Sequence, residues 1–436
     1  LREAAAAAAR RDPRVAAMAA GWLRRFEEEF PEADPARSSE SPVRLLGGNV
    51  GAGYRGWTGR VYPGSGLFGS RVTVRPRPDV SQAEASGVLA ASLGRHLAVL
   101  AEPIVGDGSP RLGRWDARAT LGPLAVSAGR EHLGWGPAHG GAIVLDDALL
   151  TRVEVATAEP VLPWRPLRFL GPVGFQTFAT RLDGAPQRGG PYLWGMRATA
   201  QPHPRFTVGL NRASIFGGDS VSTPTTAGNI ARMLVGKLSE DFENQVVSAD
   251  FRFRPPTEGV LPLVLYLEWG AEDESGGWWR SPGRVAGAYV PSLPFRPEMG
   301  VGLEHTDFGL ARRKNPPWYL HPAQPGGWVY PDRPLGHPLG GEGWEWLGYA
   351  TADVMDARLR VEGRAWLRER SAEGFYTTPQ RSGNLYAPER AGRSHGGSLD
   401  AAWRAGRRAE LRASAYGDAG SGWTERRLRV GAALLF

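Results

Sequence analysis

The end of the chain decides the fold, and it reads Leu428-Arg429-Val430-Gly431-Ala432-Ala433-Leu434-Leu435-Phe436. In a β-strand, successive side chains point to opposite faces of the sheet. The residues in step with Phe436 are all apolar: Leu434, Ala432, Val430 and Leu428. The alternate positions include Arg429 and Gly431. The pattern therefore predicts a last strand with one apolar face and one mixed face.

A terminal strand that stops on an aromatic residue is typical of bacterial outer-membrane barrels, where the insertion machinery reads it. The alternative is an ordinary last strand of a soluble β-protein. No run in the chain approaches the roughly 18 apolar residues that a membrane-spanning helix needs, and the mean hydropathy is −0.32. If the chain spans a membrane, it does so with strands, because the two faces of an alternating strand cancel in a hydropathy average.

The composition excludes several classes of protein. There are no cysteines among the 436 residues, so a disulfide framework and a thiolate metal site are both impossible. The 59 glycines and 16 tryptophans suit tight turns and the aromatic girdles of a barrel, although tryptophan also suits a carbohydrate-binding surface. The net charge of +7 is carried almost entirely by arginine, since Lys237 and Lys314 are the only lysines. These arginines are spread along the chain rather than clustered in one basic run, so we expect no nucleic-acid partner and place them in a wet lumen beside carboxylates or acidic sugars.

Two domains are predicted. Residues 1–40 form an N-terminal helical segment, broken at Pro13, whose apolar side chains recur at helical spacing. We expect this segment to close the periplasmic end of a barrel; the alternative is a helix packed on whatever follows. Residues 41–436 form the barrel. The sequence opens without a signal peptide, and we expect that one has been removed, because such a barrel must cross the inner membrane.

The central part of the chain alternates with a period of two. Residues 114–121 and 124–130 form a hairpin pattern across a Gly-Pro turn, and similar pairs continue to the end. We count about 14 to 18 candidate strands. Short turns alternate with long segments rich in glycine, proline and aromatic residues, at 213–245, 306–345 and 371–396. Short connections at one end and long ones at the other suit an outer-membrane barrel, and no blade-length repeat indicates a propeller.

Four stretches of the sequence resemble one known family. They are Gly129-Arg130-Glu131-His132-Leu133-Gly134-Trp135-Gly136-Pro137; Arg168-Phe169-Leu170-Gly171-Pro172-Val173-Gly174-Phe175 with Arg181-Leu182-Asp183-Gly184; Gly209-Leu210-Asn211-Arg212 with Phe216-Gly217-Gly218; and Gly327-Trp328-Val329-Tyr330 with Pro334-Leu335-Gly336-His337-Pro338-Leu339-Gly340. In this order, and after an N-terminal helix, they are similar to the Wzi-type capsule assembly proteins. The resemblance extends over the whole chain.

The resemblance implies an all-β transmembrane barrel of about 18 antiparallel strands, with an N-terminal α-helical periplasmic plug. It implies a lectin-like protein that binds and anchors capsular polysaccharide at the cell surface, and it does not imply an enzyme. The implied partners are capsular polysaccharide, outer-membrane lipid and the capsule export machinery in the periplasm; we expect no cofactor. The long loops depart from the family pattern, so the sugar is not predicted. The alternative function is an open porin or saccharide channel.

Three candidate ligand-binding residues lie where a predicted strand ends. Arg130 and Glu131 could hydrogen-bond sugar hydroxyls or a uronate, because an arginine fork matches a carboxylate. Trp135 could stack on a pyranose ring. The alternative is an Arg–Glu pair in the lumen and a tryptophan of the girdle.

Three more candidates, Arg181, Arg197 and Arg212, lie on successive predicted strands. If all three point into the lumen, they form a basic ladder that attracts an acidic polysaccharide. The alternative is charge balance against three carboxylates, namely those of Asp183, Asp250 and Glu268.

Trp278 and Trp279 follow an acidic, glycine-containing run that is typical of a loop. Paired aromatic residues in a loop suit a carbohydrate platform, and anchoring at the membrane interface is the alternative. The same two interpretations apply to Trp318, Tyr319, Trp328 and Tyr330.

Catalytic and metal-binding motifs are weak. The eight histidines form no HExxH pattern and no close pair with carboxylates at metal-ligand spacing. A barrel hydrolase needs serine, histidine and a polar orienting group on adjacent strands, and only Glu304-His305-Thr306 offers a local candidate. We therefore expect a binding protein without a metal.

Overall fold

The computed structural model describes residues 43–58, 80–93, 96–106, 110–183, 189–236, 242–272, 281–309, 318–322, 324, 326–330, 333–372, 390–406 and 408–435, together with Ala20 and Leu23. The predicted domain at residues 1–40, apart from Ala20 and Leu23, lies outside the described residues, as does Phe436.

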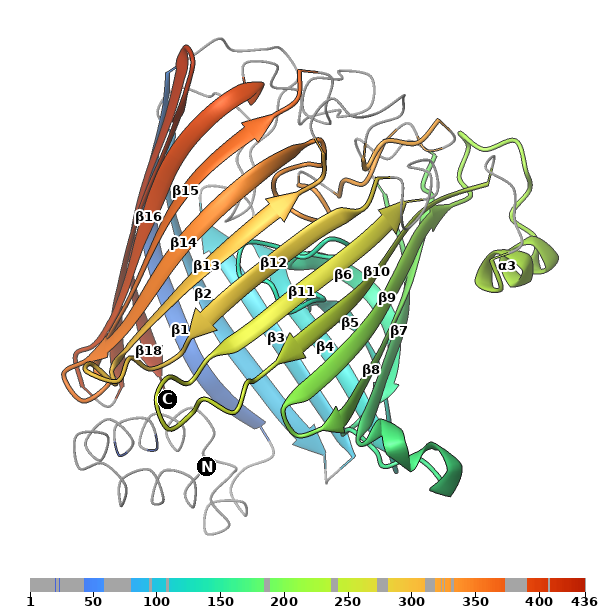
Figure 1. Ribbon diagram of the computed structural model, residues 1–436, viewed down its shortest axis with the longest axis horizontal. Coiled ribbons are helices and arrows are strands. Elements are labelled where there is room, and N and C mark those ends of the chain that lie inside the picture. The colour runs from blue at the N-terminus through green and yellow to red at the C-terminus, as the bar shows by residue number, and fades with distance from the viewer. Residues whose placement is uncertain are drawn as a thin grey trace.

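The described residues form eighteen antiparallel strands (Figure 1). In chain order they are β1 (Val43–Thr58), β2 (Val80–Leu93), β3 (Leu97–Gly106), β4 (Arg111–Leu121), β5 (Leu124–Leu133), β6 (Ala148–Thr157), β7 (Val173–Arg181), β8 (Tyr192–His203), β9 (Phe206–Phe216), β10 (Glu243–Phe253), β11 (Val264–Glu272), β12 (Gly283–Val290), β13 (Met299–Asp307), β14 (Gly343–Val354), β15 (Leu359–Arg370), β16 (Gly392–Arg404), β17 (Ala409–Gly420) and β18 (Trp423–Leu435). Each strand pairs with the next along the chain, and β1 pairs with both β2 and β18. The sheet therefore closes into one barrel, as predicted.

The outer face of the barrel is apolar, and β18 shows why. Leu428, Val430 and Leu434 point outward and are 57%, 61% and 52% exposed, whereas Arg427 and Ala433, on the opposite face, are buried. This confirms the apolar face expected from the last residues of the chain. Exposed apolar side chains also lie on the outer faces of most other strands: Leu89, Val99, Val126, Val153, Phe175, Leu210, Leu265, Leu303, Trp346, Leu367, Leu399 and Leu411. A closed barrel with such a belt buries it in hydrocarbon rather than in water.

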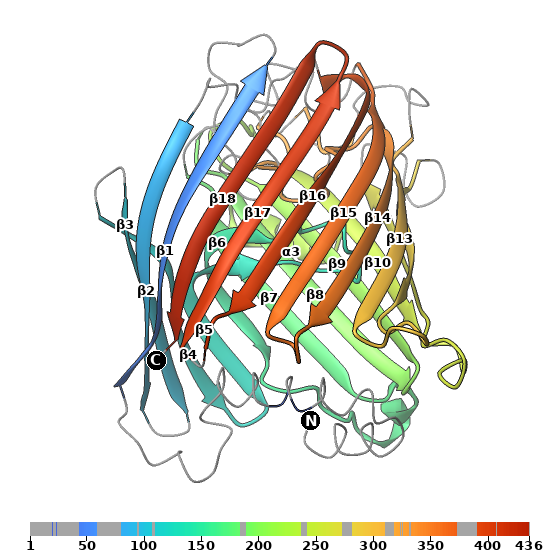
Figure 2. The ribbon, with the colours of Figure 1, turned by 90° about the vertical axis from the view of Figure 1, so that its left-hand side faces the viewer.

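The two ends of the barrel differ in the length of their connections. At one end short turns such as residues 122–123, 204–205 and 405–408 join the strands; at the other the connections include residues 217–242 and 308–342. β1 starts and β18 ends at the short-turn end (Figure 2). In outer-membrane barrels the short turns are periplasmic and the long loops extracellular, and we name the two ends accordingly.

Among the residues that the structure describes, two short helices lie outside the barrel wall. The 3₁₀-helix η2 (Arg165–Leu170) belongs to the connection between β6 and β7 at the periplasmic end. The α-helix α3 (Ala227–Leu234) belongs to the extracellular connection between β9 and β10 (Figure 1). Among the described residues, no helix has the length and apolar character needed to cross a bilayer.

Candidate functional site

The largest hydrophobic core lies inside the barrel, where two extracellular connections fold inward. They are residues 134–147, between β5 and β6, and the described part of residues 308–342, between β13 and β14; we call them together the plug. Their buried side chains pack against inward-pointing residues of the wall such as Leu150, Phe178 and Leu193. The members contributed by the plug are Trp135, Ile143, Val144, Leu145, Phe308, Trp318, Tyr319, Leu320, Trp328, Val329, Leu335 and Leu339.

Hydrogen bonds join the two segments of the plug into one body. The Tyr319 hydroxyl donates to the Ile143 carbonyl at 2.7 Å, and the Trp328 indole N–H donates to the Val144 carbonyl at 2.8 Å. Burial raises the pKa of Tyr319 well above its ordinary value, so the hydroxyl remains a neutral donor. Two of the four stretches that resemble the family reach into the plug: the first supplies Trp135, and the fourth supplies Trp328, Val329, Leu335 and Leu339.

Three buried carboxylates of the barrel wall hold the backbone of the plug. Glu304, on β13, accepts the backbone N–H groups of His139 and Gly140 at 2.8 and 3.0 Å. Glu268, on β11, accepts the N–H of Ile143 at 3.1 Å. Glu272 does the same for the N–H of Tyr319 at 2.9 Å. These contacts satisfy loop backbone groups that would otherwise be buried without a partner.

The sequence interpretation did not single out these carboxylates as plug ligands. A signal was present, because Glu268 and Glu272 are acidic residues at alternate positions of an apolar strand. Such a position predicts an inward-pointing charge, but the strand alone does not tell which partner meets it.

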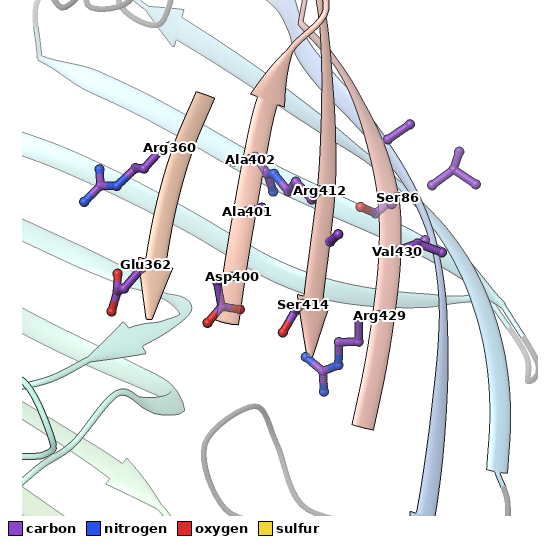
Figure 3. A pocket seen from close by; sticks show the side chains of 15 residues that line it. Ser86, Arg360, Glu362, Asp400, Ala401, Ala402, Arg412, Ser414, Arg429 and Val430 are labelled. Atoms are coloured by element: carbon purple, nitrogen blue, oxygen red, sulfur yellow. The ribbon is translucent and has the colours of Figure 1, made fainter. Parts of the chain in front are cut away.

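Beside the plug, an open cavity follows the inner face of β15 to β18 (Figure 3). Its volume is about 430 Å³, and Glu362, Asp400, Ser414 and Arg429 also line a second cavity of about 310 Å³. Arg360 and Glu362 project from β15 to the side of the wall opposite to that of Val430 on β18 (Figure 3). Within the described residues, no group of three metal-ligating side chains is found.

Several charged side chains along the two cavities form pairs. Arg364 contacts Glu362 at 2.6 Å, and the Nε2 atom of His139, from the plug, reaches the same carboxylate at 3.0 Å. Arg368 contacts Glu345 at 2.8 Å. The pair of Arg368 with Glu345 joins β15 to β14, whereas Arg364 and Glu362 lie on the same strand and Glu362 ties the wall to the plug through His139.

Aromatic rings lie among these pairs. Trp366 and Tyr416 have ring centroids 5.2 Å apart, and both hydrogen-bond the carboxylate of Asp418, at 3.1 and 3.3 Å. Arg368 lies 4.8 Å from the Trp366 ring centroid, and Arg427 lies 4.1 Å from that of Tyr416. Arginine forks, carboxylates and aromatic faces are the groups that recognise sugars and sugar acids, but here most of them bind one another.

The structure separates Arg130 from Glu131, as neighbours on a strand must be. Glu131 points into the lumen, where its carboxylate lies 3.9 Å from Arg114. Arg130 is paired in register with Trp115 on the opposite face. Trp135 is only 3% exposed; its indole N–H donates to Gln176 at 2.8 Å, so neither ring face is open to a sugar. The three residues do not form one binding surface.

The expected basic ladder does not form. In the register between β8 and β9, Arg197 faces Asn211 in the lumen, which places Arg212 beside Met196 on the outer face. Arg181 is also on the outer face, where it pairs with Asp183 at 3.1 Å, and its side chain is 57% exposed. The prediction was wrong because register, not spacing along the chain, decides which face a strand residue occupies.

Arg197 is part of a lumen network that reaches the plug. Its guanidinium contacts Asp250 at 3.0 Å and Asn211 at 2.6 Å. Asn211 donates to Ser248 at 2.9 Å, and Ser248 donates to Glu268 at 2.7 Å. The alternative of charge balance is therefore found for Arg197 with Asp250 and for Arg181 with Asp183.

Arg212 holds α3 against the outside of the barrel. It donates to the carbonyl oxygens of Met233 and Leu234, at 2.6 and 2.9 Å, in the last turn of the helix. Its guanidinium also lies 5.6 Å from the ring centroid of Trp194. A cation at a helix C-terminus satisfies the free carbonyls and the helix dipole.

The remaining aromatic candidates divide into two groups. Trp278 and Trp279 lie outside the described residues. Trp318, Tyr319 and Trp328 are fully buried in the plug, so they form neither an exposed platform nor a membrane anchor. The sequence alone could not show that a loop rich in tryptophan turns into the lumen.

Comparison with known proteins assigns the family. A sequence model of the family described as "Capsule assembly protein Wzi" matches residues 62–416. The solved structure of Wzi from Escherichia coli, described as an outer membrane protein involved in group 1 capsule assembly and a carbohydrate-binding β-barrel, is similar to the chain. The TM-score is 0.70 at 19% identity, and the match covers 96% of this chain and 89% of that one.

Two solved structures from Pseudomonas aeruginosa, OpdQ and the outer membrane protein OprD, share the fold more distantly. OpdQ gives a TM-score of 0.52 at 9% identity, covering 89% of this chain and 97% of that one. OprD gives a TM-score of 0.51 at 10% identity, covering 90% and 93%. Comparison with curated protein sequences gives no match. The match to the family model covers most of the chain, including both segments of the plug, and the chain therefore belongs to the Wzi family of capsule assembly proteins.

Proposed function

We propose that this protein binds capsular polysaccharide at the extracellular end of the barrel and anchors it at the cell surface. The observation that carries the proposal is the plug, because a lumen filled behind the extracellular loops suits retention at the surface rather than passage. Membership of the capsule assembly family supports it, and so does the carbohydrate binding ascribed to the E. coli neighbour. The role requires no cofactor and no catalytic step.

The barrel and its apolar belt support a location in the outer membrane. As part of the same proposal, a signal peptide has been removed, residues 1–40 form a helical domain at the periplasmic end, and residues 41–436 form the barrel. The periplasmic end would then face the capsule export machinery.

For the ligand we propose an acidic polysaccharide that meets the extracellular rim. Arg130 and Arg181 lie at this rim, near the extracellular ends of β5 and β7. Tyr330, from the plug, is close to both Arg130 and Asp183. Burial raises the pKa of the Tyr330 hydroxyl; the charge of Arg130 lowers this pKa and the charge of Asp183 raises it, both by less than burial does. Arginine would bind a uronate or pyruvate carboxylate, and Trp278 and Trp279 would stack on pyranose rings. We omit Glu131, Trp135, Arg197 and Arg212, because their side chains are engaged within the protein.

The test is retention of polymer by the purified barrel. Binding of an acidic capsular polysaccharide should exceed that of a neutral one and should fall as salt rises, because exposed charges are screened. Single sites of millimolar to micromolar affinity, on the order expected for weak sugar contacts, suffice when one polymer engages many. Combined R130A and R181A substitutions should weaken binding, whereas R358A and R408A, which remove the same charge at the periplasmic end, should not.

Equal binding of both polymers at every salt concentration would refute the electrostatic part of the proposal. Loss of polymer from cells carrying W278A and W279A, at unchanged synthesis, would support the aromatic part. If neither polymer binds, the anchoring role is wrong.

A further inference from the structure

The longest connection at the periplasmic end, residues 158–172, carries an unusual set of exposed apolar side chains. Leu162, Trp164 and Phe169 are 69%, 72% and 69% exposed, and Leu167 is 39% exposed. None of the residues of η2, which this connection contains, is buried. A six-residue 3₁₀-helix without burial has little stability of its own, so this segment, which we call the foot, requires a covering environment.

The exposure belongs to a segment that is held firmly at both of its ends. The backbone of Val161 exchanges two hydrogen bonds with that of Val173, at 2.9 and 2.8 Å. Gly171 has a φ of +65°, and a Cβ atom there would lie 1.9 Å from the carbonyl oxygen of Gln201. The foot therefore presents its side chains in a fixed position against the outside of the wall.

The sequence of η2 is amphipathic at the 3₁₀ period. Side chains three residues apart eclipse one another in such a helix. Trp164 and Leu167 therefore share one edge, Arg165 and Arg168 share a second, and Phe169 lies on the third with Pro166. Two apolar edges and one basic edge suit a helix that lies in a membrane interface, with its apolar edges toward the acyl chains and its arginines among headgroup phosphates.

The surroundings of the foot indicate that lipid covers its exposed apolar side chains. In Figure 1 η2 projects from the outside of the wall at the lower ends of β7 and β8, away from the lumen. The N–H of Ala158 donates to the Pro123 carbonyl at 2.8 Å, next to Leu121 and Leu124, which are exposed. At the other end of the foot, the exposed Phe175 lies on the outward apolar face of β7. The foot thus continues the apolar belt of the barrel at its periplasmic edge.

We propose that the foot lies in the periplasmic leaflet at the boundary between headgroups and acyl chains, and that Arg165 and Arg168 bind the phosphates of anionic phospholipids there. Both arginines are exposed, and no contact with a carboxylate is found for either among the described residues. Such a site would fix the rotation and depth of the barrel at one point of its circumference. This proposal goes beyond polysaccharide binding and does not depend on it.

The position of the foot can be measured with a single label, because the chain has no cysteine. L167C, labelled with the fluorophore NBD and placed in nanodiscs, should show blue-shifted emission that lipid-borne nitroxides quench and iodide does not. The control is G406C in the turn between β16 and β17 at the same end, where an added Cβ meets nothing within 4 Å; its label should be quenched by iodide. A label on the foot that is open to iodide would overturn the proposal and favour a periplasmic protein partner.

The phosphate contact is tested with R165Q and R168Q together, in nanodiscs of phosphatidylcholine with and without phosphatidylglycerol. The intact barrel should retain phosphatidylglycerol selectively after detergent extraction. Each arginine removed should lower that selectivity about fivefold, which corresponds to about 1 kcal/mol. R358Q with R408Q, exposed arginines of two other periplasmic turns, makes the same change in charge and should leave selectivity unchanged. Heat-modifiable migration on gels verifies folding of each variant, and equal selectivity in all folded variants would disprove the site.

Discussion

The carboxylate of Glu304, on the barrel wall, accepts hydrogen bonds from two backbone N–H groups of the plug. It is 1% exposed, accepts the N–H groups of His139 and Gly140, and also accepts the Tyr266 hydroxyl at 2.7 Å. A buried charge is tolerated only when its lone pairs are filled in this way. The residue therefore specifies where the loop lies rather than adding stability as an isolated charge.

We expect Glu304→Ala to loosen the plug. Each buried N–H left without an acceptor costs about 1–3 kcal/mol, so the urea midpoint of unfolding should fall and the loop at 134–147 should become sensitive to protease. Asp400→Ala is the control, because Asp400 is an exposed lumen carboxylate with no ion pair found among the described residues. Equal stability of the two variants would show that the plug does not depend on Glu304.

A second residue-scale prediction concerns backbone conformation. Gly171 and Gly122 have φ values of +65° and +61°, but only at Gly171 would a Cβ meet another atom. Both alanine variants incur the strain of left-handed backbone, about 1–2 kcal/mol. Gly171→Ala should lower the thermal midpoint clearly further, because the foot must move away from β8. If the two variants lose the same stability, the close approach to Gln201 is unimportant.

At the scale of elements, the register of each strand pair decides which arginines face the lumen and which serve outside it. Arg212 acts outside, where it fastens α3 to the wall through Met233 and Leu234. The helix itself is short, and Thr226 caps its start by accepting the N–H of Asn229 at 3.3 Å. Its position therefore depends on packing against Phe216 and on this one arginine.

We expect Arg212→Ala to free α3 without unfolding the barrel. Proteolysis within residues 217–236 should become faster, while heat-modifiable migration of the barrel should not change. Hydrogen bonds to a charged group contribute about 1.5–3 kcal/mol, so a local effect of that size is expected. Arg181→Ala removes the same charge from the outer face two strands away and should leave the loop resistant. Protection of the loop in the Arg212 variant would contradict the fastening role.

At the scale of the whole molecule, the plug divides the lumen into a filled side and an open cavity beside β15 to β18. An anchoring protein and an open channel therefore differ in one measurable property, the conductance of single molecules in planar bilayers. We expect the intact protein to conduct weakly. Replacing residues 136–146 with a short Gly-Ser linker should raise conductance, because the loop contributes Ile143 and its neighbours to the filled side.

A matched variant lacking residues 1–35 distinguishes closure of the lumen by the plug from closure by the N-terminal segment. An increase in its conductance would support the proposed periplasmic role of the N-terminal segment. Large conductance of the intact protein, unchanged by either deletion, would support the porin alternative instead.

Much of the architecture could be predicted from the sequence, because strand alternation is a local property with a period of two. The face of Leu428, Val430 and Leu434, the hairpin that became β4 and β5, and the long loops near 213–245 and 306–345 all follow from neighbours in the chain. The stretches that resemble the Wzi family identified it correctly, although their role in the plug was not recognised. The two-residue period of a strand, however, does not fix which of its two faces turns inward.

Only the tertiary structure decided the interior. Whether Arg197 or Arg212 faces the lumen depends on the register between β8 and β9, and a shift of one residue would exchange them. The path of the plug depends on contacts between residues remote in sequence, such as the Tyr319 hydroxyl with the Ile143 carbonyl. The sequence predicts surface positions for Trp135, Trp318 and Trp328. It shows that a loop is apolar, but it does not show that the barrel will enclose that loop. Burial is a property of the closed barrel, and it exists only once all eighteen strands are in place.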